Sequence, residues 1–201
     1  WVPDFEDTPN LTGKLGHLKS PMSHVKYIGP LSRLQKKEVP MQYDLMVILS
    51  GPEPQRSILE HRLRDSIDEY SGKVVFICGK MALQQSKIQI ENVTFYNFMT
   101  TAQLEQTYNE SKMVLCRSGY TTVMDLVALN KKAFFIPTPG QYEQEYLAKR
   151  LKKNNLFPYA KQEDFTFDKL LEIDLYEKAT FKNESIHWKN LFCLFERKGE
   201  F

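Results

Sequence analysis

Short apolar runs that alternate with helical patterns constrain the fold of this chain more than any other feature. Five runs rich in β-branched or aromatic residues occupy 43–50, 73–78, 92–98, 112–116 and 131–137. Such runs are typical of strands that are buried on both faces. Helical patterns follow three of them, at 56–70, 120–130 and 143–155. This alternation favours parallel pairing with right-handed crossovers and predicts an α/β fold with a doubly wound, Rossmann-like parallel sheet.

The apolar residues of the predicted helices indicate which face of each helix meets the sheet. In the helix expected over 56–70, one face is predicted to carry Ile58, Leu59, Leu63 and Ile67. The helix expected over 120–130 has the same pattern, and Asn130 is a plausible C-terminal stop. Both helices are therefore expected to lie on the sheet.

The two ends of the chain differ from this core. Residues 1–40 contain several prolines and glycines and are expected to form irregular chain and a linker. Residues 41–175 are expected to form the α/β domain. Residues 176–201 carry large apolar side chains, including Trp188, Phe192 and Phe195, so a helical tail that packs on another surface is expected there.

Composition excludes several classes of function. The formal charge is only +2, because 27 basic residues are balanced by 25 acidic ones, so a nucleic-acid partner is not expected. The three cysteines, Cys78, Cys116 and Cys193, are widely spaced and odd in number, which indicates reduced thiols and a cytoplasmic protein. No apolar run reaches the roughly 18 to 20 residues of a transmembrane helix. The histidines lack metal-ligand spacing, and no Walker loop, Gly-x-Gly-x-x-Gly or Asp-x-Asp motif is present, so no metal or dinucleotide cofactor is expected.

The residues that follow the strands form the candidate site, because ligands of open parallel sheets bind beyond the carboxyl ends of the strands. Ser50 and Gly51 follow the first strand. After the fourth strand, Ser118 is expected to cap the next helix, whose first amides could bind a diphosphate. Asp125, on the same helix, could accept the hydroxyls of a ribose. The alternatives are a plain capped turn and an aspartate that is merely solvated, and both stay open at this point.

The order and spacing of these residues resemble the C-terminal domain of family 28 glycosyltransferases from Tyr43 to about Phe165. The strongest match is CRSGYTTVMDLVALNKKAFFIPTPGQYEQEY, at 116–146. The segments WVPD and YIGPLSRL also resemble the chain that joins the two halves of such enzymes. The resemblance implies the C-terminal half of the GT-B fold. It also implies a preceding half that holds the acceptor site and usually the catalytic base. Residues 1–40 are then expected to form the end of that half and the interdomain linker, and the rest of it lies outside this sequence.

The resemblance also implies which residues contact a UDP-sugar donor. Ser50 and Gly51 correspond to the first donor loop, and Phe98 and Met99 to the loop that holds the uracil. Five consecutive residues correspond to the diphosphate turn: Arg117, Ser118, Gly119, Tyr120 and Thr121. Asp125 corresponds to the ribose-binding acidic position. Gln144 and Glu145 correspond to the pair that contacts the sugar, and the second member of this pair suggests a sugar other than N-acetylglucosamine.

The function implied is donor binding in an inverting glycosyltransferase that transfers a hexosyl group to an acceptor hydroxyl. The acceptor, whether glycan, lipid-linked sugar or small molecule, is left open, and this chain alone is expected to be inactive. The implied mechanism uses helix N-termini in place of a metal ion. A cytoplasmic enzyme, or one peripheral to the inner face of the membrane, is expected. The alternatives are a UDP-sugar epimerase of the same architecture and a non-catalytic donor-binding subunit.

Overall fold

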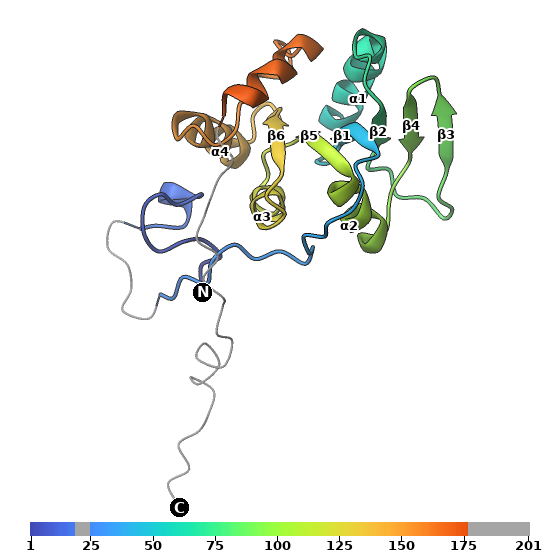
Figure 1. Ribbon diagram of the computed structural model, residues 1–201. Helices are drawn as coiled ribbons and strands as arrows, with labels where there is room; N and C mark the ends of the chain where they lie inside the picture. The colour runs from blue at the N-terminus through green and yellow to red at the C-terminus, as the bar shows by residue number, and fades with distance from the viewer. Residues whose placement is uncertain (19–24, 177–201) are drawn as a thin grey trace, which may run out of the picture.

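The computed structural model describes residues 1–18 and 25–176, and the sheet at its centre confirms the predicted α/β class. Six strands pair in the order β3-β4-β2-β1-β5-β6 (Figure 1). Their bounds are β1 Tyr43–Ile48, β2 Val74–Ile77, β3 Lys87–Ile90, β4 Val93–Tyr96, β5 Ser111–Cys116 and β6 Lys132–Phe135. All neighbours pair in parallel except β3, which is antiparallel to β4. The expected tail after Tyr176 lies outside the described residues.

Helices cover both faces of the sheet, as a doubly wound fold requires. The helices are α1 Gln55–Ser66, α2 Thr101–Glu110, α3 Tyr120–Ala128 and α4 Tyr142–Lys153, and the 3-10 helices are η1 Gly13–Leu15, η2 Ile67–Glu69 and η3 Phe167–Leu175. One apolar core joins the sheet to α1 and η3, and a second joins it to α2, α3 and α4. In Figure 1, α1 and η3 accordingly lie above the sheet, and α2 and α3 lie below it.

The sequence predictions miss helix α2 and strand β3, as well as the 3-10 helices η1 and η3. Helix α2 begins with a capping box, in which the Thr100 side chain accepts from the Gln103 amide and the Gln103 side chain accepts from the Thr100 amide. Strand β3 is an edge strand whose four residues are all exposed, so it shows no burial pattern.

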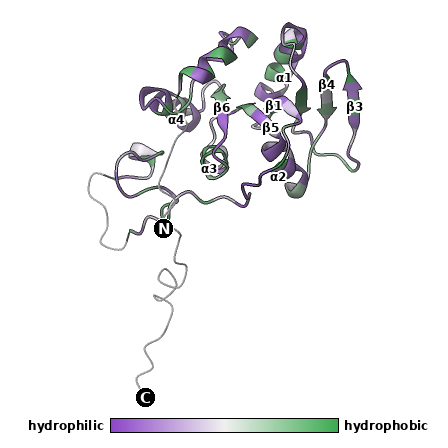
Figure 2. Cartoon of the chain, in the orientation of Figure 1, coloured by the Kyte–Doolittle hydropathy of each residue, from purple (hydrophilic) through white to green (hydrophobic). Residues whose placement is uncertain are grey.

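The prediction for Ile58 is wrong. Its side chain is 41% exposed, whereas Leu59, Leu63 and Ile67 are buried against the sheet. Successive residues of a helix are turned by about 100°, so Ile58 cannot share the face of Leu59 and Leu63. Figure 2 shows both hydrophobic and hydrophilic turns in the helices, as expected when one face of a helix lies on the sheet.

The register of the parallel strands places their carboxyl ends in one row. Ile48 of β1 pairs with Ile77 of β2 and with Cys116 of β5. Ile77 in turn pairs with Tyr96 of β4, and Cys116 pairs with Phe135 of β6. The loops that follow β1, β2, β4, β5 and β6 therefore begin at the same edge of the sheet, which is where the sequence places the candidate site.

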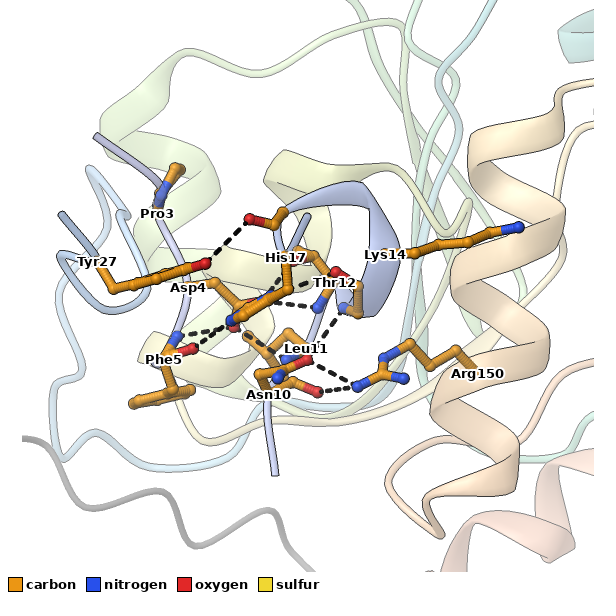
Figure 3. A network of polar contacts seen from close by, with 12 residues as sticks. Pro3, Asp4, Phe5, Asn10, Leu11, Thr12, Lys14, His17, Tyr27 and Arg150 are labelled. Atoms are coloured by element: carbon orange, nitrogen blue, oxygen red, sulfur yellow. Dashed lines mark hydrogen bonds and ion pairs between the residues drawn. The ribbon is translucent and has the colours of Figure 1, made fainter. Parts of the chain in front are cut away.

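The N-terminal segment, residues 1–18, is irregular as predicted, but it is packed around a buried carboxylate. Asp4 has no exposed surface, and its carboxylate accepts from the amides of Phe5, Leu11 and Thr12 and contacts the Thr12 hydroxyl (Figure 3). Leu11 is fully buried in the core shared with α2, α3 and α4. This segment is thus part of the folded domain and not a free linker.

Candidate functional site

The first candidate loop, residues 50–54, connects β1 to α1. Ser50 and Gly51 are exposed, and Gly51 has φ +98°, a conformation that favours glycine. The Glu53 carboxylate accepts hydrogen bonds from the Ser57 amide (3.2 Å) and the Ser57 hydroxyl (3.0 Å) and pairs with Arg56. An acidic side chain therefore already occupies the positive N-terminal end of α1.

The side chain of Arg117, in the predicted diphosphate turn, points into the protein. It is 1% exposed, and its guanidinium donates to four acceptors: the carbonyls of Ile136 (3.1 Å), Pro137 (3.2 Å) and Gln55 (3.0 Å) and the side chain of Gln162 (2.8 Å). Burial lowers the pKa of Arg117 to about 10. This side chain ties the ends of β5 and β6 to the start of α1 through its two Nη groups, whereas its buried Nε has no hydrogen-bond partner in the described part of the chain.

The prediction that Ser118 caps helix α3 is wrong. The N-cap residue is Gly119, which makes no side-chain capping bond. Ser118 is buried, and its hydroxyl donates instead to the carbonyl of Gln144 (2.8 Å), which joins the turn to α4. Because the Ser118 hydroxyl points toward this carbonyl, it cannot also accept from the first amides of α3. Helix α3 therefore begins without a capping side chain of its own.

Glu143 is a candidate site residue that the sequence predictions omit. The amide of Tyr120, at the first position of α3, donates to a carboxylate oxygen of Glu143 across 3.4 Å. Because the N-terminus of a helix carries a partial positive charge, this carboxylate lies where an anionic ligand would also be attracted. The sequence feature that could have identified Glu143 is an acidic residue at the start of the helix that follows the fifth predicted strand.

Gln144 and Glu145, the predicted sugar-contacting pair, hold the loop that follows β6, residues 136–141. The Gln144 side chain is buried, accepts from the Thr138 amide (2.8 Å) and donates to the Gln141 side chain (2.6 Å). The Glu145 carboxylate accepts from the Gly140 amide (3.0 Å). Both side chains thus shape this loop, and Glu143 is the acidic residue of α4 that reaches the diphosphate turn.

Asp125, the predicted ribose ligand, is half-buried. The hydroxyl of Ser32 donates to its carboxylate with a distance of 2.6 Å. Burial raises the pKa of Asp125, whereas the Ser32 hydrogen bond and the charge of Arg33 act in the opposite direction. This aspartate is therefore not a solvated surface carboxylate, although the side chain that covers it comes from a distant part of the sequence.

Phe98 and Met99, the predicted uracil loop, lie between β4 and α2 at the same sheet edge. Both are half-buried. The Phe98 carbonyl accepts from the Gln85 side chain (2.7 Å), and the Met99 sulfur accepts from the Thr107 hydroxyl (3.5 Å). The loop therefore has a fixed backbone and keeps apolar side-chain surface partly exposed.

The N-terminal segment borders the diphosphate turn. The Tyr120 hydroxyl donates to the Pro3 carbonyl (2.9 Å), and burial, with smaller contributions from the charges of Asp4 and Glu143, raises the pKa of Tyr120 to about 12. The segment also binds α4, where Arg150 donates to the carbonyl (3.1 Å) and the side chain (2.7 Å) of Asn10 (Figure 3). Residues far apart in sequence thus meet around the start of α3.

Neither a metal-binding cluster nor a membrane-spanning helix occurs in the described part of the chain. In residues 1–18 and 25–176, no group of three or more His, Cys, Asp or Glu side chains could hold a metal ion. No helix in the same ranges has the length and apolar character needed to cross a membrane.

Comparison with known proteins gives consistent matches. The model of the glycosyltransferase family 28 C-terminal domain matches residues 54–186. UDP-N-acetylglucosamine--N-acetylmuramyl-(pentapeptide) pyrophosphoryl-undecaprenol N-acetylglucosamine transferase from Haemophilus ducreyi is 28% identical over 153 residues, which cover 73% of this chain and 42% of the relative. The transferase of the same name from Haemophilus influenzae is 28% identical over 134 residues, which cover 63% of this chain and 38% of the relative. The chain thus spans about two fifths of the length of these relatives.

Solved structures match the fold. The crystal structure of Acinetobacter baumannii MurG aligns with a TM-score of 0.51 and 18% identity and covers 70% of this chain and 44% of that chain. The structure of the kitacinnamycin glycotransferase aligns with a TM-score of 0.52 and 14% identity, over 74% of this chain and 40% of that chain. At these identities the matches show the fold alone, which is the C-terminal half of the GT-B fold.

Proposed function

Because this chain belongs to the glycosyltransferase family 28 C-terminal domain family, we propose that it binds a UDP-sugar as the donor half of an inverting glycosyltransferase. The observation that carries the proposal is the single row formed by the carboxyl ends of β4, β2, β1, β5 and β6, which gathers the predicted donor-binding loops at one edge. The curated relatives support UDP as the nucleotide, since their names specify a UDP-N-acetylglucosamine transferase. The same names favour a transferase over an epimerase.

The diphosphate would bind at the N-terminus of α3, in the position near the Tyr120 amide that Glu143 now occupies. Entry of the diphosphate would displace this carboxylate, because two anions compete for one positive helix end. The leaving UDP would then be stabilised by backbone amides and the helix dipole, with no metal ion required.

The remaining parts of the donor would bind on either side of this turn. The uracil would lie against Phe98 and Met99, and the ribose hydroxyls would bind the oxygen of Asp125 that Ser32 leaves free. The sugar would lie near the loop of residues 136–141, which Gln144 and Glu145 hold in shape. In this arrangement Gln144 and Arg117 act on the donor by positioning backbone groups.

The acceptor and the catalytic base would come from a preceding half, so this chain alone would transfer no sugar. The names of the curated relatives specify a lipid-linked acceptor, pyrophosphoryl-undecaprenol. For this chain we propose an acceptor hydroxyl on a lipid-linked sugar, a glycan or a small molecule, and a site of action in the cytoplasm or at the inner face of the membrane.

Titration calorimetry with UDP, GDP, UDP-N-acetylglucosamine and other UDP-hexoses tests the proposal, with EDTA present throughout. We expect UDP to bind more tightly than GDP, and one UDP-sugar to bind more tightly than the others. Equal affinity for UDP and GDP would contradict the uracil site, and loss of UDP binding in EDTA would contradict the metal-free diphosphate site. Absence of binding by every nucleotide would contradict donor binding altogether.

A further inference from the structure

Thr138 lies where three parts of the candidate site meet. It follows β6, and its side chain is buried, with 1% of the residue exposed. Its amide donates to the Gln144 side chain (2.8 Å), and its carbonyl accepts from the Gln141 amide (3.1 Å). The backbone of Thr138 is therefore fixed by the loop and by the start of α4.

The hydroxyl of Thr138 has no hydrogen-bond partner within the described part of the chain. It faces the first loop, because a Cβ atom built on Gly51 would lie 3.5 Å from this oxygen. Gly51 is exposed and has φ +98°, so a residue without a side chain lies next to this hydroxyl. A buried hydroxyl without a partner loses its hydrogen bonds to water and gains none in the protein, which destabilises the fold.

Valine has nearly the same shape as threonine and would fill the same space without an unpartnered hydroxyl. The presence of threonine, which makes the fold less stable, therefore suggests that the hydroxyl has a function. A second buried polar atom without a partner belongs to a neighbouring side chain: Nε of Arg117, whose guanidinium binds the carbonyls of Ile136 and Pro137, just before Thr138. Buried polar groups without a partner are rare in folded proteins, so two of them close together at the carboxyl ends of β5 and β6 indicate that a polar partner is missing here.

We propose that the Thr138 hydroxyl is a donor-binding group, which bonds an oxygen of the sugar-diphosphate when the loop over residues 50–54 moves away from it. The inference rests on the proposed function. It adds a hydrogen bond from Thr138 to the part of the donor where the diphosphate joins the sugar. Both the phosphate and the sugar carry oxygen atoms that could accept this hydrogen bond. Comparing the binding of UDP with that of a UDP-sugar distinguishes a phosphate acceptor from a sugar acceptor.

The test compares Thr138→Val and Thr138→Ser with the wild type in the full chain. Calorimetry measures the affinity for UDP and for the UDP-hexose that the wild type binds best, and thermal unfolding measures stability. We expect Thr138→Val to weaken donor binding about tenfold, the loss of one good hydrogen bond. The same variant should raise the thermal midpoint by about 2–4 °C, the shift expected for about 1 kcal/mol in a chain of this size. Thr138→Ser keeps the hydroxyl and should restore the affinity.

The two ligands identify the acceptor. A loss seen with UDP indicates a phosphate oxygen, and a loss confined to the UDP-hexose indicates a sugar hydroxyl. Thr94→Val is the matched control, because Thr94 is also buried but its hydroxyl donates to Gln89 at the far edge of the sheet. This control should lower stability and leave binding unchanged.

The proposal is overturned if Thr138→Val binds both ligands within twofold of the wild type, or if Thr138→Ser loses as much affinity as Thr138→Val. Either result is distinct from failure of the proposed function, in which the wild type itself binds no UDP-sugar and both proposals fall.

Discussion

The Ser32 hydroxyl donates a 2.6 Å hydrogen bond to the carboxylate of Asp125, across 93 positions of sequence. Ser32 is held in turn by the Leu34 amide, which donates to its oxygen (3.0 Å). The segment that precedes the α/β core thus fixes one oxygen of the predicted ribose ligand.

Replacing Asp125 by alanine should weaken UDP binding about ten- to a hundredfold, the scale of hydrogen bonds to a charged group. Calorimetry measures the loss. 2′-Deoxy-UDP is the matched ligand, because it lacks one of the two hydroxyls. If Asp125 binds the ribose, the effects of the substitution and of the missing hydroxyl should not add. Strictly additive effects would show that Asp125 does not contact the ribose.

Asp125 should also give folding a defined pH dependence. Burial raises its pKa in the folded state, so folding favours the protonated form. Its stabilising contribution is therefore complete below the pKa of the unfolded chain, about 3.9, and is lost as pH rises through the higher folded pKa. Asp125→Asn cannot ionise, so it should not lose stability as the pH rises. The thermal midpoint of the variant minus that of the wild type should therefore increase with pH. A constant difference between the two proteins over the range from about pH 4 to 7 would refute the burial effect.

Arg117→Ala should destabilise the fold by about 2–4 kcal/mol, because four acceptors lose their donor inside the protein. Urea unfolding measures the change. Arg62→Ala is the control, since Arg62 donates one exposed hydrogen bond to the Glu163 carbonyl (2.8 Å) and should cost less than about 1 kcal/mol. Normal stability of Arg117→Ala with loss of UDP binding would instead place the guanidinium on the donor.

Glu143→Gln should strengthen UDP binding about two- to tenfold at low salt, because the carboxylate near the Tyr120 amide competes with the diphosphate. Glu145→Gln changes the net charge equally but acts at the Gly140 amide, so it should have a smaller effect. Equal gains in the two variants would mean that only overall charge matters. The gain should also shrink as salt is added.

Gly13→Ala should weaken the contacts between the N-terminal segment and α4, because the ends of the Tyr146 and Arg150 side chains would have to move away from the added methyl group. A Cβ at this position would lie 2.5 Å from the Tyr146 hydroxyl and 2.6 Å from Cζ of Arg150. Gly29→Ala is the matched control, because Gly29 also has positive φ but a Cβ added there would have no atom within 4 Å. Hydrogen exchange should therefore increase around Asp4 and Leu11 in the first variant alone. An equal increase of hydrogen exchange in both variants would show that the effect comes from backbone strain at a positive φ and not from the contact with α4.

The main fold could be predicted because five of its six strands and three of its helices carry clear hydrophobic patterns. Helix α2 starts with a readable capping pattern at Thr100 and Gln103, but its polar composition hides its apolar face. Strand β3 is exposed on all four residues and has no pattern to read. The sequence order also located the candidate loops, because parallel strands bring their carboxyl ends together.

The directions of the site side chains could not be predicted in the same way. Arg117 and Gln144 turn inward because carbonyl and amide groups there need partners. Ser118 likewise bonds a carbonyl on α4 and leaves the helix uncapped. Contacts such as Ser32 to Asp125 depend on tertiary packing between distant segments, and no local spacing encodes them.

The burial of Leu11 in the core shared with α2, α3 and α4 sets a limit on how this protein can be shortened. The boundary suggested by composition lies near residue 40, but a polypeptide that starts there would expose the apolar surface that Leu11 covers and would remove the hydrogen-bond partner of the Tyr120 hydroxyl. Such a truncated chain should self-associate in solution, whereas a chain that retains residues 1–18 keeps this surface covered.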